Sequence, residues 1–255
     1  MSAKLRIILT FALALILILS AAKVVITEIE YKKAAAAYDK SREENFFLST
    51  TVSSCISGEY FPNVYVDLYS LKSVNPETIG WLWIPGTNIS YPLMQSDDNF
   101  KYLNRTYSLQ KSSSGAIFID YRNSPDFSDA LSVIYGHNMK SGDMFGGLKK
   151  YSDPLYLSEH SDMYIFTEKS SLKYKIFTAF IVGCDSPLFS FGFSERTGLG
   201  DLPEYIKSCA GGSILNEPDG KSPVVMLSTC TSAGRDKRFV VLASLEAEKE
   251  SQSAF

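Results

Sequence analysis

The sequence is poor in the residues that build metal and redox sites. Among its 255 residues are two histidines and four cysteines, and no two cysteines lie within 20 positions of each other. Structural zinc sites need clustered cysteines and histidines, and thioredoxin-type centres need a Cys-x-x-Cys pair, so both classes are excluded. A glycine-rich phosphate-binding loop is also missing. We therefore expect no metal site and no cofactor.

The charge balance excludes a further class of partner. The chain has 25 lysines and arginines against 28 aspartates and glutamates, so it lacks the basic excess that binds nucleic acid. Internal repeats and low-complexity tracts are absent as well. Beyond its N-terminal segment, the chain has the length of one domain of about 200 residues with a sizeable core.

One long apolar run stands at the N-terminus. Residues 7–22 carry no charge, and with their flanks they reach from 5 to 26, which is long enough to cross a bilayer. Lys4 and Arg6 precede the run and predict that the N-terminus stays inside the cell. We expect a single-pass cell-membrane protein whose main domain is extracellular. A cleaved signal peptide is the alternative, because residues 20–22 are small.

After the apolar run the pattern changes from helical to mainly β. Residues 28–47 are charged, alanine-rich and free of glycine and proline, which predicts a helix. Short β-branched and aromatic runs then recur at close spacing, as in a β-sandwich or barrel. The expected strands are 81–83 and 89–91, joined by a tight turn at Pro85-Gly86, and 115–120, 129–135, 164–167, 174–182, 224–227 and 239–242. A helical turn is expected to open at 75–78, and a short helix at 202–209.

The stretch 222–245 places two reactive residue types at the inner ends of a predicted hairpin. If 224–227 pairs with 239–242, Cys230 ends the first strand and Arg238 opens the second. Hydroxyl residues flank this cysteine and basic residues follow it, a setting that stabilises a thiolate. A buried free thiol or half of a disulfide is the alternative for Cys230. The alternative for Arg238 is an ordinary exposed cation at a strand edge. Arg235 is its rival for any catalytic role.

Histidine scarcity leaves two candidates for a general acid or base. His137 follows an apolar strand and Gly136 in VIYGHNM, and strand ends of this kind often carry catalytic residues. A structural histidine held by hydrogen bonds is the alternative there. His160 lies in the polar stretch LSEHSD and is expected to be a surface residue.

These motifs, in this order, resemble the sortases, the membrane-anchored cysteine transpeptidases of Gram-positive bacteria. The resemblance rests on Y-G-H-N at 135–138, L-S-T-C at 227–230 and the arginine eight positions after the cysteine. Within the family, the chain resembles class B in particular. The features shared with that class are Gly80-Trp81, Tyr91-Pro92, Asn99, Tyr102-Leu103 and a long insertion at 184–223.

The resemblance implies a closed β-barrel of about eight strands, with N-terminal helices and a helix in the insertion before the cysteine strand. It divides the chain into a cytoplasmic tip and transmembrane anchor (1–27), a helical segment (28–63), the catalytic barrel (64–246) and a polar C-terminal tail (247–255).

It also implies a reaction. Cys230 would be the nucleophile, His137 the general acid and base, and Arg238 the group that stabilises the oxyanion or the substrate. The enzyme would cleave a C-terminal sorting motif of the N/S/P-P-x-T type in secreted surface proteins after its threonine. An amine of the peptidoglycan cross-bridge or of lipid II would then resolve the thioester. The substrate would be bound by Asn99, Leu103, Ser228 and Thr229.

Two other functions remain open from the sequence. An extracellular papain-like hydrolase would need a third residue to orient the histidine, and Asn138, its neighbour in sequence, is poorly situated for that role. A non-catalytic surface binding domain would instead have its four cysteines in structural disulfides.

Overall fold

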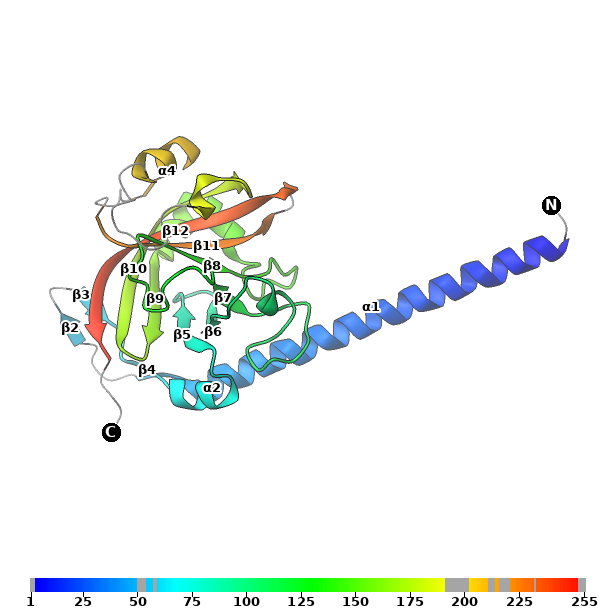
Figure 1. Ribbon diagram of the computed structural model, residues 1–255, viewed down its shortest axis with the longest axis horizontal. Helices are drawn as coiled ribbons and strands as arrows, with labels where there is room; N and C mark the ends of the chain where they lie inside the picture. The colour runs from blue at the N-terminus through cyan, green and yellow to red at the C-terminus, as the bar shows by residue number, and fades with distance from the viewer. Residues whose placement is uncertain are drawn as a thin grey trace.

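A closed barrel of eight strands forms the centre of the computed structural model, which describes residues 3–49, 54–56, 59–190, 202–210, 214–215, 221–231 and 233–251. The order around the barrel is β10-β12-β11-β8-β7-β6-β5-β9 (Figure 1). The strands are β5 (Thr78–Trp83), β6 (Ser90–Met94), β7 (Ile117–Ile119), β8 (Leu131–Tyr135), β9 (Asp162–Thr167), β10 (Ser170–Gly183), β11 (Val224–Thr231) and β12 (Gly234–Glu250). The mainly β prediction is confirmed.

Strand β11 is apolar without interruption because both of its faces are covered. Val225 and Leu227 belong to the core inside the barrel, whereas Val224 and Met226 belong to a second apolar cluster outside it. That outer cluster includes residues of α4 (Leu202–Ala210), which lies over this side of the barrel in Figure 1. Strands buried on both faces lose the alternation of half-exposed ones. The short helix predicted at 202–209 is confirmed.

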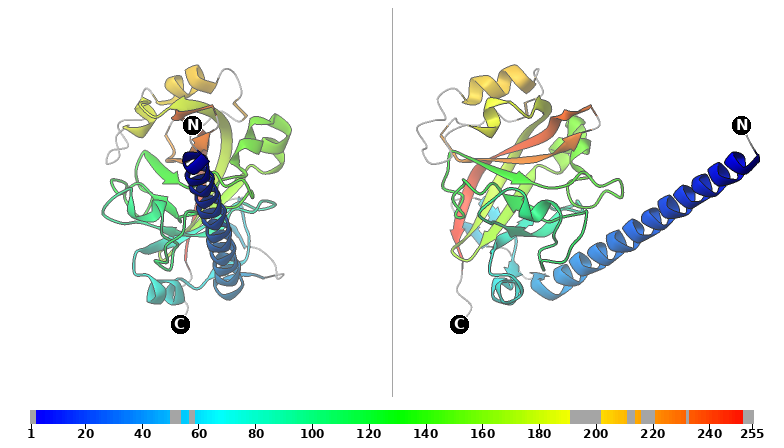
Figure 2. Two further views of the ribbon diagram at one scale, coloured as in Figure 1. Left: turned by 90° about the vertical axis from the view of Figure 1, so that its right-hand side faces the viewer. Right: turned by 45° about the vertical axis from the view of Figure 1, so that its right-hand side comes forward.

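A single helix, α1 (Ala3–Asn45), joins the apolar run to the barrel. It is long and apolar enough to cross a membrane, and Figures 1 and 2 show its N-terminal part projecting away from the barrel as one rod. Near its C-terminal end Ala34, Tyr38, Ser41 and Asn45 are buried. Their spacing of three or four residues puts them on one face, which packs against the barrel. The predicted helix at 28–47 is therefore confirmed as a continuation of the apolar segment as far as Asn45, where strand β1 (Phe46–Leu48) replaces it.

Short elements connect α1 to the first barrel strand along the chain. They are two small antiparallel pairs, β1 (Phe46–Leu48) with β4 (Val64–Val66) and β2 (Ser54–Ile56) with β3 (Glu59–Phe61), together with α2 (Leu68–Val74). Further along the chain are η1 (Lys101–Leu103), η2 (Leu148–Ser152), α3 (Pro154–Glu159) and η3 (Pro187–Phe189).

The helical turn predicted to open at 75–78 is wrong, because a helix ends there instead. Asn75 is the C-cap of α2, and its backbone N–H donates to the carbonyl of Leu71. Its φ of −149° and ψ of 109° are extended, as expected for a residue that precedes a proline. Strand β5 then begins at Thr78.

The predicted hairpin forms, but its second strand is longer at both ends than the sequence indicated. Cys230 pairs with Arg238, although β12 already begins at Gly234. At the other end Glu250 pairs with Ser170 of β10, so residues 247–250 are strand and not the polar tail that we predicted. Strand β10 has 14 residues and offers a partner along this length. Residues 252–255 of the tail lie outside the described residues.

Candidate active site

All seven predicted site residues line one pocket of about 210 Å³ at the edge of the barrel. Among the described residues its lining is Asn99, Leu103, Phe118, Tyr135, Gly136, His137, Ser228, Thr229, Cys230 and Arg238. Residues separated by up to 139 positions in the chain (238 − 99) thus meet in one place.

Three neighbouring strands create this meeting point. Strands β8 and β11 are parallel with Tyr135 beside Ser228, so both chains reach the same edge of the barrel. Strand β12 runs back along β11 and sets Arg238 beside Cys230. Past the end of β8 the backbone N–H of Gly136 still donates to the Ser228 carbonyl at 3.2 Å. The first turn of the loop that carries the histidine is therefore fixed to the cysteine strand.

Gly136 is required by close packing. A Cβ atom there would lie 2.5 Å from Cδ1 of Ile117 and 2.7 Å from Cδ2 of Phe145. Its carbonyl accepts a hydrogen bond of 2.6 Å from the hydroxyl of Thr229. The glycine before the histidine thus lets the loop press against the barrel wall.

His137 is half-buried, and its Nε2 lies 2.6 Å from the carbonyl oxygen of Leu103. A carbonyl can only accept, so Nε2 carries a proton in this contact and Nδ1 is the nitrogen left for proton exchange. The backbone carbonyl of His137 accepts from the N–H of Phe145 at 3.0 Å. Backbone groups therefore hold both the ring and the main chain of His137, and the ring's partner is a carbonyl and not a carboxylate.

Cys230 is exposed and has a free thiol, and its carbonyl accepts a 2.8 Å hydrogen bond from Nδ2 of Asn138. Cys184 and Cys209 are also free. The alternative with all four cysteines in disulfides is therefore wrong for these three, whereas the side chain of Cys55 lies outside the described residues.

Arg238, and not Arg235, contributes to the described lining of the pocket. Arg238 is half-buried, and its Nη1 donates to the carbonyls of Arg235 at 3.1 Å and Lys237 at 2.9 Å. Arg235 itself is exposed. Since two backbone carbonyls restrain the Arg238 side chain, it is the better-held cation of the two.

A buried carboxylate behind the pocket was not identified from the sequence. Asp120 is fully buried and accepts hydrogen bonds from Nδ2 of Asn99 (2.9 Å), the hydroxyl of Tyr135 (3.0 Å) and two nitrogens of Arg122 (2.9 and 2.8 Å). Burial alone would raise the pKa of Asp120, but these hydrogen bonds outweigh burial and lower it. Burial and the neighbouring carboxylate raise the pKa of Tyr135. Asp120 thus stays ionised and holds two pocket residues.

Only a weak signal in the sequence marks this hydrogen-bond network. Asp120 ends the apolar run GAIFID, and a polar residue at a strand end is a common feature. Tyr135 stands in the Y-G-H-N motif, and Phe118 sits in the same strand run as the aspartate, yet neither was predicted to line the pocket.

His160 lies apart from this pocket, as the sequence indicated, but it is half-buried and not simply at the surface. Its ring stacks on Tyr156 with centroids 4.1 Å apart, and its Nδ1 lies 3.0 Å from the Tyr156 carbonyl. In the part of the chain that the structure describes, no group of three or more His, Cys, Asp or Glu residues could hold a metal ion.

Comparison with known proteins identifies the family. A family model for the sortase domain matches residues 82–246. The chain belongs to the sortase family. It is 35% identical over 164 residues to a protein named sortase B from Listeria monocytogenes, and the alignment covers 64% of this chain and 67% of that protein.

Solved structures of class B sortases share the fold. Sortase B from Bacillus anthracis in complex with AAEK2 matches with a TM-score of 0.66 and 27% identity, over 84% of this chain and 96% of that one. A class B sortase of Streptococcus pyogenes involved in pilus biogenesis matches with a TM-score of 0.63 and 31% identity, over 71% and 98%. The chain is therefore a class B sortase, a cysteine transpeptidase, and the predicted family and barrel are confirmed.

Proposed function

We propose that this sortase attaches secreted proteins to the cell wall, with Cys230 as nucleophile, His137 as general acid and base, and Arg238 as oxyanion or substrate stabiliser. The proposed substrate is a C-terminal sorting motif of the N/S/P-P-x-T type, cleaved after threonine. The observation that carries the proposal is the convergence of these three side chains on one pocket beside four others expected to bind substrate. The α1 helix would anchor the enzyme in the cell membrane, with the barrel outside.

In the first half-reaction the Cys230 thiolate adds to the threonine carbonyl carbon. The tetrahedral intermediate then collapses to a thioester, and His137 gives a proton to the departing amine. Arg238 would donate to the oxyanion, and removing one such donor costs roughly 3 to 4 kcal/mol in other enzymes. Nε2–H of His137 is occupied by Leu103, so Nδ1 would exchange the proton.

In the second half-reaction an amine attacks the thioester. Neutral His137 takes a proton from the amine nitrogen as the new amide bond forms, and the Cys230 thiolate leaves. A thiolate is a good leaving group, which favours transfer of the acyl group to an amine.

The described contacts indicate a different role for each of the residues proposed to bind substrate. The hydroxyl of Ser228 is buried without a partner in the described part of the chain, so a polar group of the peptide would satisfy it. Asn99 is oriented by Asp120 and by the N–H of Tyr121 at 3.0 Å, whereas Leu103 would contribute apolar surface. Thr229 already donates to Gly136 and would mainly shape the wall.

The acceptor amine would reach Cys230 through a second groove. This groove, of about 770 Å³, is lined by both neighbours of the cysteine, Thr229 and Thr231, and by Asn138. Its described lining also includes Lys140, Lys149 and Lys150 and no carboxylate. A positive groove attracts an anionic carrier, as a cross-bridge peptide or lipid II with its carboxylates and phosphates would be.

A papain-like hydrolase remains the second candidate for the chemistry, but its geometry is less well supported. The amide of Asn138 donates to the carbonyl of Cys230, and the histidine ring is held by a backbone carbonyl. In a papain-like site a side chain would orient the imidazole.

Mass spectrometry of the full chain in detergent, incubated with an N-P-x-T peptide and a glycine or diaminopimelate-type amine, tests the proposal. The expected product is the cleaved peptide joined to the amine, absent when Cys230 is replaced by alanine. Free acid as the sole product, at every amine concentration tried, would favour the hydrolase instead.

A further inference from the structure

Tyr38 connects the membrane-proximal helix to the interior of the barrel. It is 4% exposed, and its hydroxyl donates to the carbonyl of Gly115 at 2.7 Å. The same oxygen accepts from the backbone N–H of Tyr107 at 3.3 Å. Burial raises the pKa of Tyr38, so the hydroxyl keeps its proton and the donor role is fixed.

Gly115, which Tyr38 holds, lies against the imidazole of His137. Its φ is +60°, and a Cβ built there would stand 3.0 Å from Cδ2 of His137. The same Cβ would be 3.0 Å from the carbonyl oxygen of Leu103, which is the acceptor of the His137 ring. A side chain at position 115 would therefore crowd both the histidine ring and the carbonyl that holds it, so the glycine backbone lies close to the two groups.

Tyr38 also supports the loop that follows His137. Its ring meets Tyr91 edge to face with centroids 5.4 Å apart, and the Tyr91 hydroxyl accepts from the N–H of Met144 at 3.0 Å. Met144 in turn forms an isolated antiparallel β-bridge with Asn138, the residue after the histidine. One buried side chain of α1 thus touches the supports on both sides of the histidine.

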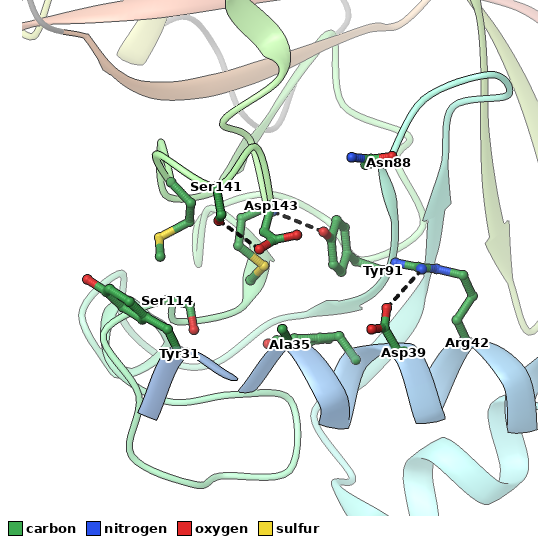
Figure 3. Close-up of a pocket in the computed structure, with 12 residues that line it drawn as sticks. Tyr31, Ala35, Asp39, Arg42, Asn88, Tyr91, Ser114, Ser141 and Asp143 are labelled. Carbon is green, nitrogen blue, oxygen red and sulfur yellow. Dashed lines mark hydrogen bonds and ion pairs between the residues drawn. The ribbon is translucent and has the colours of Figure 1, made fainter. Parts of the chain in front are cut away.

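Elsewhere a cleft of about 210 Å³ separates α1 from this loop. Figure 3 shows Tyr31, Ala35 and Asp39 of the helix on one side and Ser141 and Asp143 of the loop on the other. Tyr38 lines the same cleft, and it reaches the loop through Tyr91, whose ring it contacts and whose hydroxyl accepts from the N–H of Met144.

We propose that Tyr38 is a positioning residue for His137, so that the helix emerging from the membrane segment forms part of the catalytic module. The kinetic side of this proposal rests on the general acid and base role proposed for His137; the geometric side does not. Since α1 is continuous from Ala3 to Asn45, the same helix that would hold the enzyme at the membrane also sets the position of its imidazole.

The test compares the Tyr38→Phe variant with the wild-type enzyme, both as the full chain in detergent micelles. Tyr31→Phe is the matched control. Tyr31 lies two turns earlier on α1 and lines the cleft. Rates are normalised to protein concentration, and thermal unfolding confirms that each variant is folded. The chain has only two histidines, so a spectrum of histidine-labelled protein contains one reporter signal, His137, and one internal reference, His160.

Tyr38→Phe should lower kcat on the order of fivefold, the equivalent of one hydrogen bond, and change KM for the sorting peptide less than about twofold. It should also shift the His137 ring signal while leaving that of His160 unchanged, and Tyr31→Phe should change neither kcat nor the His137 signal. A lower melting temperature with unchanged kcat and an unchanged His137 signal would reduce Tyr38 to a purely structural role and overturn the proposal. If the wild-type enzyme joined no peptide to amine, the proposed function would fail, while the spectra would still decide whether Tyr38 positions His137.

Discussion

Two free, exposed cysteines lie on either side of the strand that carries Arg238, and they differ in what surrounds them. Cys230 pairs with Arg238 from β11, and Cys184 follows the end of β10 on the opposite side of β12. Cys184 and Arg238 share a small pocket with Tyr135 and Phe189, whose described lining contains no histidine. The pocket of Cys230 includes His137. Both sites thus have an exposed thiol near an arginine, and the imidazole is what distinguishes them in the proposed function.

The largest expected effect separates the two thiols. Cys230→Ala should reduce transpeptidation by more than about a thousandfold, because removal of a nucleophile leaves only binding and electrostatic stabilisation. Cys184→Ala should change kcat/KM less than about twofold. Product formation by mass spectrometry, with far-UV circular dichroism to confirm folding, measures both. Comparable losses in the two variants would show that the nucleophile is wrongly assigned.

The arginine that both cysteines share provides the next test. Arg238→Lys should lower kcat by roughly 100-fold, since lysine keeps the charge but loses the planar set of donors. Arg235→Lys is the matched control, because that side chain is exposed and lies outside the described pocket lining, and it should stay near wild type. Severe loss in the control, with Arg238→Lys silent, would transfer the role to Arg235.

The carboxylate behind the Cys230 pocket should matter for stability in a pH-dependent way. Asp120→Asn should lower the free energy of unfolding at pH 7 by on the order of 2 kcal/mol, because it removes a charged acceptor of buried hydrogen bonds. The folded-state pKa of Asp120 is depressed, so its contribution is present above the unfolded value of about 3.9 and is lost as pH falls through the folded value.

Urea unfolding of wild type and Asp120→Asn at pH 7 and pH 3 measures this difference. The gap between the two proteins should shrink at the lower pH. A gap that stays constant between the two pH values would mean that the charge of Asp120 contributes little.

The sequence could predict the residues that stand in local motifs, but not the contacts between segments that are far apart in the chain. Cys230, His137 and Arg238 were found because each stands in a local motif at a strand end, and strand pairing then follows from short apolar runs. The hydrogen bonds of Asp120 and Tyr38 join segments far apart in the chain, and an aspartate or a helical tyrosine carries no local mark of its future partner. The length of β12 was missed for a similar reason, since its polar end is strand only because β10 runs beside it.

The smallest expected effect separates two buried serine hydroxyls. Ser228 and Ser132 lie on adjacent strands, and neither hydroxyl has a partner in the described part of the chain, but only Ser228 lines the pocket. Replacing either by alanine should leave stability unchanged or raise it by up to about 1 kcal/mol, because an unsatisfied polar group is removed. Ser228→Ala alone should raise KM for the sorting peptide about fivefold, the equivalent of one lost hydrogen bond. Steady-state kinetics on both variants measures KM for the sorting peptide. Equal KM values for Ser228→Ala and Ser132→Ala would show that the Ser228 hydroxyl binds no part of the peptide.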